Sequence, residues 1–170
     1  MNLFLDIDGV ICPSFFSGRN CSARCQTARF EAIMRDYPEW NIVISSGRRE
    51  KKSLQALREM FSADIAERIV GVTPLLGLTV KHGRQREIER YLRDCRQASI
   101  PWVVLDDRAS EFEEGLDNLV LCNFEIGLDD FSEARLREKL AAGRQAVHSG
   151  APVQAGQGGL GSNSNGIVES

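Results

Sequence analysis

Residues 3–10 read Leu-Phe-Leu-Asp-Ile-Asp-Gly-Val, and this stretch decides how the rest of the chain is interpreted. Its first three residues are apolar without polar alternation, which is typical of a strand buried on both faces of a sheet. Asp6 and Asp8 are two residues apart, so in an extended chain both side chains point to the same side. Gly9 then allows the chain to turn away. The stretch therefore predicts a buried strand, over residues 3–8, that delivers two carboxylates to one edge of a sheet.

The rest of the chain alternates between segments of this kind and helical segments. Apolar runs indicate four further strands, at residues 41–45, 68–73, 102–107 and 119–123. Apolar residues at helical spacing predict helices within residues 30–37, 54–61, 88–95 and 131–140. This alternation predicts an α/β fold with a doubly wound, Rossmann-like, mostly parallel sheet of about five strands and helices on both faces. The segments between the strands leave no room for a large cap domain.

Composition indicates where the folded domain ends. The 170 residues are 42% hydrophobic and 26% charged, which is ordinary for a globular domain. After Ala142 the composition changes, because residues 143–170 are rich in Gly, Ser, Asn and Gln and contain no aromatic residue. Such a segment buries too little apolar surface to offset the entropy of ordering it. We therefore expect one domain over residues 1–142 and a flexible tail over residues 143–170.

Charge, hydropathy and cysteine content exclude several classes of protein. A formal net charge of −3 argues against a globally basic nucleic-acid-binding protein. No apolar run reaches the roughly 20 residues that span a bilayer, and the first residues do not resemble a secretory signal. The five cysteines lack Cys-x-x-Cys spacing, which argues against a zinc site and favours free, buried thiols. We expect a cytoplasmic enzyme or binding module.

Acidic residues follow two of the predicted strands, at the edge where ligands bind in such sheets. Asp6 and Asp8 suit Mg²⁺, and they also suit chemistry in which one carboxylate attacks phosphorus and the other moves protons. Asp106 and Asp107 would repel each other unless a cation or a donor lay between them. A metal shared with Asp6 would remove that repulsion. Solvated acids at a strand end are the simpler alternative for the first pair.

Candidate phosphate-binding groups occur at two further places. Ser46 and Gly47 begin a strand-to-helix turn, where hydroxyl and backbone N–H groups can hold phosphate oxygens, although Ser is also common there as a helix cap. We expect the neighbouring Arg48 and Arg49 to lie on a solvated face, with bidentate contact to phosphate as the alternative. Three basic residues cluster where the third helix begins: Lys81, Arg84 and Arg86. The helix dipole makes a basic group at a helix N-terminus mildly unfavourable, so a basic group at that position is explained if it faces phosphate or the carboxylates. We expect at least two of the three to face solvent.

Together these segments resemble the haloacid dehalogenase (HAD) superfamily of phosphohydrolases. The resemblance is carried, in order, by Asp6-Ile7-Asp8-Gly9-Val10, by Ser46 in Ser-Ser-Gly-Arg, and by Asp106-Asp107. The third motif of the family is a lone basic residue, matched either by Arg84, in register with Glu87 and Ile88, or by Lys81. Arg84 would replace the Lys that is usual there. The chain also resembles a small bacterial subfamily of compact HAD domains, some of which are fused to or associated with RNA-repair proteins. The segments that carry this resemblance are residues 84–88, 102–107, 119–122 and 127–129.

The resemblance implies a role for each matched residue. Asp6 attacks phosphorus and becomes a phosphoaspartate. Asp8 protonates the leaving oxygen and later activates water, and its backbone carbonyl helps to hold Mg²⁺. The implied metal-binding set is Asp6, Asp8, Asp107 and, directly or in support, Asp106. The implied phosphate-binding set is Ser46, Gly47 and one of Arg84 and Lys81.

The implied function is that of a Mg²⁺-dependent phosphatase that forms an aspartyl-phosphate. A site without a cap is open, which favours a large phosphoester such as a nucleic-acid 3′- or 5′-phosphate end. The segment 11–20 is placed to cover the site, where Phe15 and Phe16 either stack a base or pack into the core. Two alternatives stay open: a phosphatase for small metabolites or nucleotides, and a non-catalytic module that binds phosphate or a protein.

Overall fold

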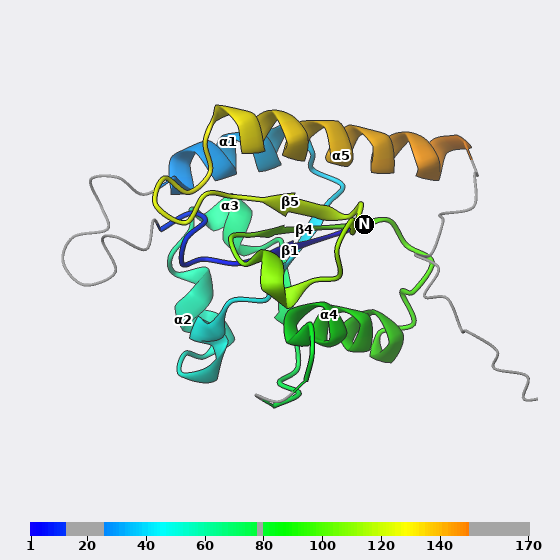
Figure 1. Cartoon of the computed structure of the whole chain (residues 1–170). Coiled ribbons are helices and arrows are strands. Elements are labelled where there is room, and N and C mark those ends of the chain that lie inside the picture. The colour runs from blue at the N-terminus through cyan, green and yellow to red at the C-terminus, as the bar shows by residue number, and fades with distance from the viewer. Residues whose placement is uncertain (13–25, 78–79, 150–170) are drawn as a thin grey trace, which may run out of the picture.

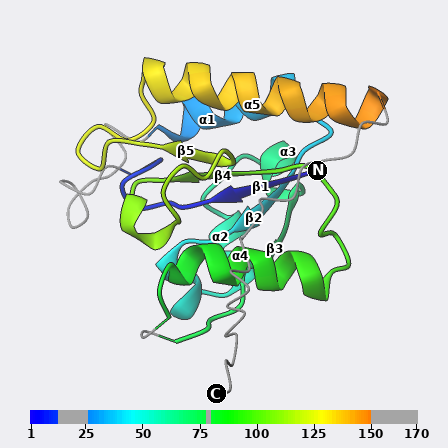
Figure 2. The ribbon, with the colours of Figure 1, turned by 45° about the vertical axis from the view of Figure 1, so that its right-hand side comes forward.

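A computed structural model describes residues 1–12, 26–77 and 80–149. Its sheet has five strands in the order β3-β2-β1-β4-β5, and all neighbouring strands are parallel (Figures 1 and 2). The strands are β1 (Asn2–Leu5), β2 (Asn41–Ile44), β3 (Ile69–Val72), β4 (Trp102–Asp106) and β5 (Leu119–Leu121). The helices are α1 (Thr27–Asp36), η3 (Gly47–Glu50), α2 (Leu54–Arg58), α3 (Ala63–Ala66), α4 (Gly83–Asp94), η4 (Ala109–Glu111) and α5 (Asp130–Ser149). The predicted α/β fold without a cap domain is confirmed, and the sheet is parallel throughout.

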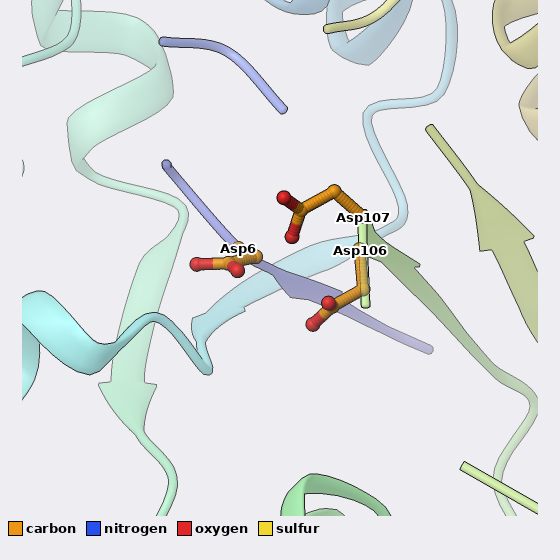
Figure 3. A group of neighbouring side chains, drawn as sticks. All are labelled: Asp6, Asp106 and Asp107. Carbon is orange, nitrogen blue, oxygen red and sulfur yellow. The ribbon is translucent and has the colours of Figure 1, made fainter. Parts of the chain in front are cut away.

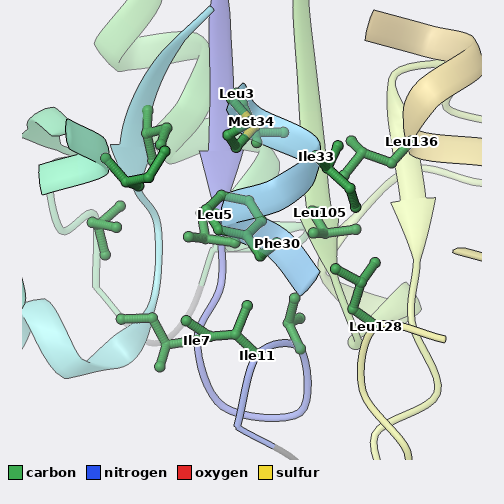
Figure 4. Packing of buried hydrophobic residues seen from close by; sticks show 14 of the residues in the cluster. Leu3, Leu5, Ile7, Ile11, Phe30, Ile33, Met34, Leu105, Leu128 and Leu136 are labelled. Carbon is green, nitrogen blue, oxygen red and sulfur yellow. The ribbon is translucent and has the colours of Figure 1, made fainter. Parts of the chain in front are cut away.

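Helices cover both faces of the sheet, so each strand contributes alternate side chains to two cores. Helices α1 and α5 lie on one face and α4 lies on the other (Figures 1 and 2). On the first face, Leu3 and Leu5 of β1 pack with Phe30 and Ile33 of α1 (Figure 4). On the second face, Phe4 packs in a cluster with side chains of α4, Ile88 and Leu92. Burial on both faces explains why the strands read as continuous apolar runs.

The order of the strands determines where a site can form. From the central β1, the chain first builds β2 and β3 on one side and then β4 and β5 on the other. The direction of winding therefore changes between β1 and β4, and ligands bind beyond the carboxyl ends of strands at such a point. The Asp6 N–H donates to the Leu105 carbonyl at 3.0 Å, which continues the pairing just past the end of β1. The residues after β1 and β4 are thus brought side by side.

Helix α5 is longer than the composition of the chain predicts. Asp129 precedes it and accepts a hydrogen bond from the Ser132 N–H at 2.8 Å, as a helix cap does. The helix then continues to Ser149, so the domain boundary expected after Ala142 falls inside a helix. Gly143, expected in the tail, is buried. The rest of the predicted tail, residues 150–170, lies outside the described residues.

Gly143→Ala is expected to destabilise the protein, although helix propensity alone favours Ala by about 1 kcal/mol. A Cβ at this position would lie 2.5 Å from Cζ2 of Trp40 and 2.8 Å from its Cη2. The Trp40 side chain is only 1% exposed, so it has little room to move. Such overpacking costs about 1–3 kcal/mol, which thermal unfolding would detect as a lower Tm. A higher Tm would mean that α5 does not pack this closely on Trp40.

Two further expectations can be compared with the described residues. Of the described cysteines, Cys12 and Cys122 are buried as expected, whereas Cys95 is exposed because it follows the last turn of α4. Cys21 and Cys25 lie outside the described residues. Within residues 1–12, 26–77 and 80–149, no helix combines the length and apolar character needed to cross a membrane.

Candidate active site

The turn after β1 presents the first two acidic residues. The Ile7 carbonyl accepts hydrogen bonds from the N–H groups of Val10, Ile11 and Cys12, and the Gly9 N–H donates to the Cys12 carbonyl at 2.7 Å. This closes a tight turn immediately after Asp6. The Asp6 side chain is buried, and its Oδ1 accepts a hydrogen bond from the Ile7 N–H at 2.7 Å, which orients the carboxylate.

Glycine is required at position 9 for two independent reasons. The residue has a φ of +79°, a backbone conformation that residues with a Cβ rarely adopt. A Cβ there would also lie 1.9 Å from Oδ2 of Asp107. The missing side chain therefore makes room for a carboxylate from the neighbouring strand, and the turn after β1 and the end of β4 form one site.

Arg84 is the basic residue that reaches this site. Its Nη1 lies 2.6 Å from Oδ2 of Asp6 and 2.7 Å from Oδ2 of Asp106, and its side chain is only 9% exposed. Burial by itself would lower the pKa of Arg84, but the charges of Asp106 and Asp6 raise it above its usual value.

The other two basic residues of this segment lie at the surface. Lys81 is exposed, and Arg86 pairs with Glu89 and Glu113. The structure thus favours Arg84 over Lys81 for the basic position, and two of the three basic residues face outward as expected.

Three acidic residues meet at the ends of β1 and β4: Asp6, Asp106 and Asp107 (Figure 3). One carboxylate oxygen from each lies within 4.8 Å of the other two. Burial, together with the charge of Asp6, raises the pKa of Asp106 to about 7, although Arg84 opposes the rise. Burial and the charge of Asp6 also raise the pKa of Asp107. Three carboxylates face one guanidinium here, so the site carries an excess of negative charge.

The donor set fits a hard divalent cation. Oδ1 of Asp107 is buried and has no hydrogen-bond partner among the described residues, and an unpartnered carboxylate oxygen in such a place is costly unless a cation binds it. Asp106 is already occupied, because it accepts from Arg84 and from the Arg108 N–H at 2.9 Å. Asp6 is occupied in the same way, by Arg84 and by the Ile7 N–H, so among the three residues Asp107 is the one that offers a cation a buried oxygen without a hydrogen-bond partner among the described residues. The side chain of Asp8 does not belong to this group of three.

Asp8 is instead paired with Arg48. Nε of Arg48 lies 2.9 Å from Oδ2 of Asp8, and its Nη2 lies 2.5 Å from Oδ1. This is a two-pronged contact of the kind that Arg makes with carboxylates and phosphates. The expectation that Arg48 lies on a solvated face is wrong, because β2 ends beside β1 and the turn after β2 directs Arg48 at Asp8. Both side chains remain partly exposed, at 25% for Arg48 and 40% for Asp8.

The turn after β2 carries the predicted hydroxyl. Ser46 is completely buried, and its Oγ accepts a hydrogen bond from the Arg48 N–H at 3.4 Å, so it caps η3. Gly47 is exposed and begins η3. The structure therefore places Ser46 and Gly47 at the end of β2, next to the strand that carries Asp6, and Ser46 also serves as the cap that the sequence leaves as an alternative.

Arg49 has a buried side chain, although the sequence pattern predicts that it lies at the surface. Its side chain is 4% exposed and forms an ion pair with Glu87 of α4. It also donates to the carbonyls of Ser45, Ser46 and Thr73. Burial lowers the pKa of Arg49, and the charge of Glu87 opposes this. Because Glu87 lies one helical turn after Arg84, this pair holds the Ser46 turn against the helix that supplies Arg84. The sequence signal for it is only the register of Glu87 with Arg84.

Most of the chain is similar to a known protein family. A family model described as the HAD domain in Swiss Army Knife RNA repair proteins matches residues 2–132. This range includes every candidate site residue and ends just inside α5. Neither the curated proteins nor the solved structures include a significant match to the chain. Phe15 and Phe16, which the sequence places near the site, lie outside the described residues.

Proposed function

Because the chain belongs to the family of HAD domains in Swiss Army Knife RNA repair proteins, we propose that it is a Mg²⁺-dependent phosphatase that acts on the phosphorylated ends of nucleic acids. One observation carries the proposal: the cluster of Asp6, Asp106 and Asp107, the first two of which are buried, meets Arg84 at the switch point of the sheet. Carboxylates bind a cation there, the guanidinium binds phosphate, and Asp6 lies between the two.

The proposed reaction has two steps. Oδ of Asp6 attacks phosphorus, the bond from phosphorus to the ester oxygen breaks, and Asp8 in its acid form gives that oxygen a proton. Water then attacks phosphorus, Asp8 takes a proton from it, and the bond to Asp6 breaks to release inorganic phosphate. Ser46 and Arg84 hold the phosphoryl oxygens during both steps. These groups act mainly by position and charge, which is what phosphoryl transfer requires.

A bound Mg²⁺ would be held by Asp6 and Asp107 with support from Asp106, and would neutralise negative charge between Asp6 and the phosphate. The Asp8 backbone carbonyl is proposed as a further ligand.

The contact between Arg48 and Asp8 adds a requirement to this mechanism. While both carboxylate oxygens of Asp8 contact the Arg48 guanidinium, they are not available to the ester oxygen or to water. The phosphate group of a substrate carries more negative charge than a carboxylate and accepts the same two-pronged contact. We expect Arg48 to move from Asp8 to the bound phosphate, which would hold the substrate and free Asp8 for proton transfer.

Phosphate release tests the proposed function directly. The purified chain is expected to release phosphate from 3′- or 5′-phosphorylated RNA oligonucleotides in Mg²⁺, and to lose this activity when the metal is chelated. Mg²⁺ should also raise the Tm, less so below about pH 7, because burial raises the pKa of Asp106 and Asp107 and protons then compete with the cation for these two carboxylates. Preferred release from glycerol phosphate or free nucleotides would instead indicate a small-molecule phosphatase. Binding of Mg²⁺ without turnover of any ester would indicate a non-catalytic module.

A further inference from the structure

A compact turn after β5 exposes two large apolar side chains. The Asn123 carbonyl accepts hydrogen bonds from the N–H groups of Ile126, at 3.1 Å, and Gly127, at 2.7 Å. Oδ1 of Asn123 accepts from the Glu125 N–H at 2.9 Å. Residues 123–127, the rim turn, are therefore held in shape by their own hydrogen bonds. Phe124 and Ile126 within it are each 52% exposed.

Hydrogen bonds on both flanks hold the rim turn beside the candidate active site. On one flank, the Cys122 N–H donates to the Asp106 carbonyl at 2.8 Å. On the other, the Leu128 N–H donates to the Val10 carbonyl at 2.9 Å. Val10 belongs to the turn that presents Asp6 and Asp8, and Asp106 is in the acidic cluster. The rim turn is thus joined to both strand ends that build the site.

Basic residues lie on the opposite side of the site. Lys51 and Lys52 follow η3 and are exposed, and Arg48 lies one turn before them. They come from the end of β2, whereas the rim turn comes from the end of β5. In the strand order, β1 and β4 lie between these two ends, and those two strands supply Asp6 and Asp106. The site therefore has an apolar, aromatic rim on one side and a cationic rim on the other.

We propose that the rim turn is the docking surface for the terminal base of a phosphorylated RNA end, with the next phosphates of the chain over Lys51 and Lys52. This inference rests on the proposed function, because the terminal phosphate must occupy the site. An exposed aromatic ring on a preformed turn stacks any base at little entropic cost, and lysines attract the backbone without reading sequence. A small phosphoester would reach neither rim.

Substitution of Phe124 tests this assignment. Phe124→Ala is expected to weaken the binding of a fluorescent 3′-phosphorylated RNA trinucleotide about tenfold, whereas Phe124→Trp keeps a ring and should retain binding. The ratio of KM for the trinucleotide to KM for glycerol phosphate should rise by a similar factor in Phe124→Ala. Val147→Ala is the matched control, since Val147 is 54% exposed but lies near the carboxyl end of α5.

The outcomes separate this inference from the proposed function. Equal binding of the trinucleotide by the wild type and Phe124→Ala, or no binding by the wild type, would overturn the assignment of the rim turn even if phosphate release is confirmed. Weaker binding by Phe124→Ala without turnover by any variant would support the rim turn while the phosphatase proposal fails. Sedimentation velocity tests whether a second copy of the chain binds the rim turn instead. A wild-type dimer that Phe124→Ala dissociates would make the rim turn a contact between copies, and the RNA proposal would be wrong.

Discussion

Asp6→Asn is expected to lower the rate of phosphate release at least about a thousandfold, which corresponds to about 4 kcal/mol of activation free energy. Asn has nearly the shape of Asp but lacks the anionic oxygen that would attack phosphorus. The substitution also removes a carboxylate from the acidic cluster, so it should weaken Mg²⁺ binding as well. Steady-state phosphate release at saturating Mg²⁺ measures the loss, because the weaker metal affinity is then offset by concentration.

The loss of activity should occur without loss of the fold. In the metal-free protein Asp6 is one of three carboxylates around a single guanidinium, and its charge raises the pKa of Asp106. Asn at this position relieves that repulsion and leaves the contact between Arg84 and Asp106 in place, so the Tm should stay level or rise. Asp94→Asn, at an exposed carboxylate at the far end of α4, should retain full activity. An Asp6→Asn variant that still turns over substrate would exclude Asp6 as the nucleophile.

Glu87→Ala is expected to have the largest effect on stability, about 3–5 kcal/mol in the free energy of unfolding. It leaves the Arg49 guanidinium buried without a carboxylate, and an unpaired buried charge is much more costly than the loss of an exposed pair. It also removes the acceptor of the Leu76 N–H, which donates to Oε1 of Glu87 at 3.2 Å. Urea unfolding measures the change. Glu87→Gln keeps that acceptor and should cost less.

A second ion pair on the same helix provides the control. Arg90 and Asp94 of α4 are 2.7 Å apart, but each side chain is 52% exposed. Asp94→Ala should therefore change the free energy of unfolding by less than about 1 kcal/mol. If Glu87→Ala lowered the free energy of unfolding no more than Asp94→Ala does, Arg49 and Glu87 would not be a buried pair in solution. The inference that this pair holds the Ser46 turn against α4 would then be wrong.

Local sequence patterns were enough to predict the fold and the centre of the site. A run of apolar residues that ends in Asp-x-Asp-Gly identifies both a buried strand and its carboxyl end, because strand period and turn residues are local properties. Strand ends in a parallel sheet meet at one edge, so Asp6, Ser46, Asp106 and Asp107 could be assigned to one site before any contact was known. The family match over residues 2–132 supports the predicted fold.

The basic residues were decided only by the tertiary structure. Lys81 and Arg84 are three positions apart, and the packing of α4 on the sheet determines which one faces Asp6 and Asp106. Arg48 and Arg49 look alike in the sequence, yet one pairs with Asp8 and the other is buried against Glu87. A long cationic side chain finds its partner on another element, and no local period records that partner.

The end of α5 shows the same division. Glycine and small polar residues after Ala142 indicate, by composition, a chain that does not fold alone. Gly143 is nevertheless helical, because its missing side chain lets α5 pack on Trp40, over a hundred residues earlier. The sequence by itself determined the strands, the order in which functional residues follow them, and the acidic site, since these features depend on residues that are neighbours along the chain. Tertiary structure decided the partners of Arg84, Arg48 and Arg49 and the length of α5, because burial against distant elements supplies that free energy.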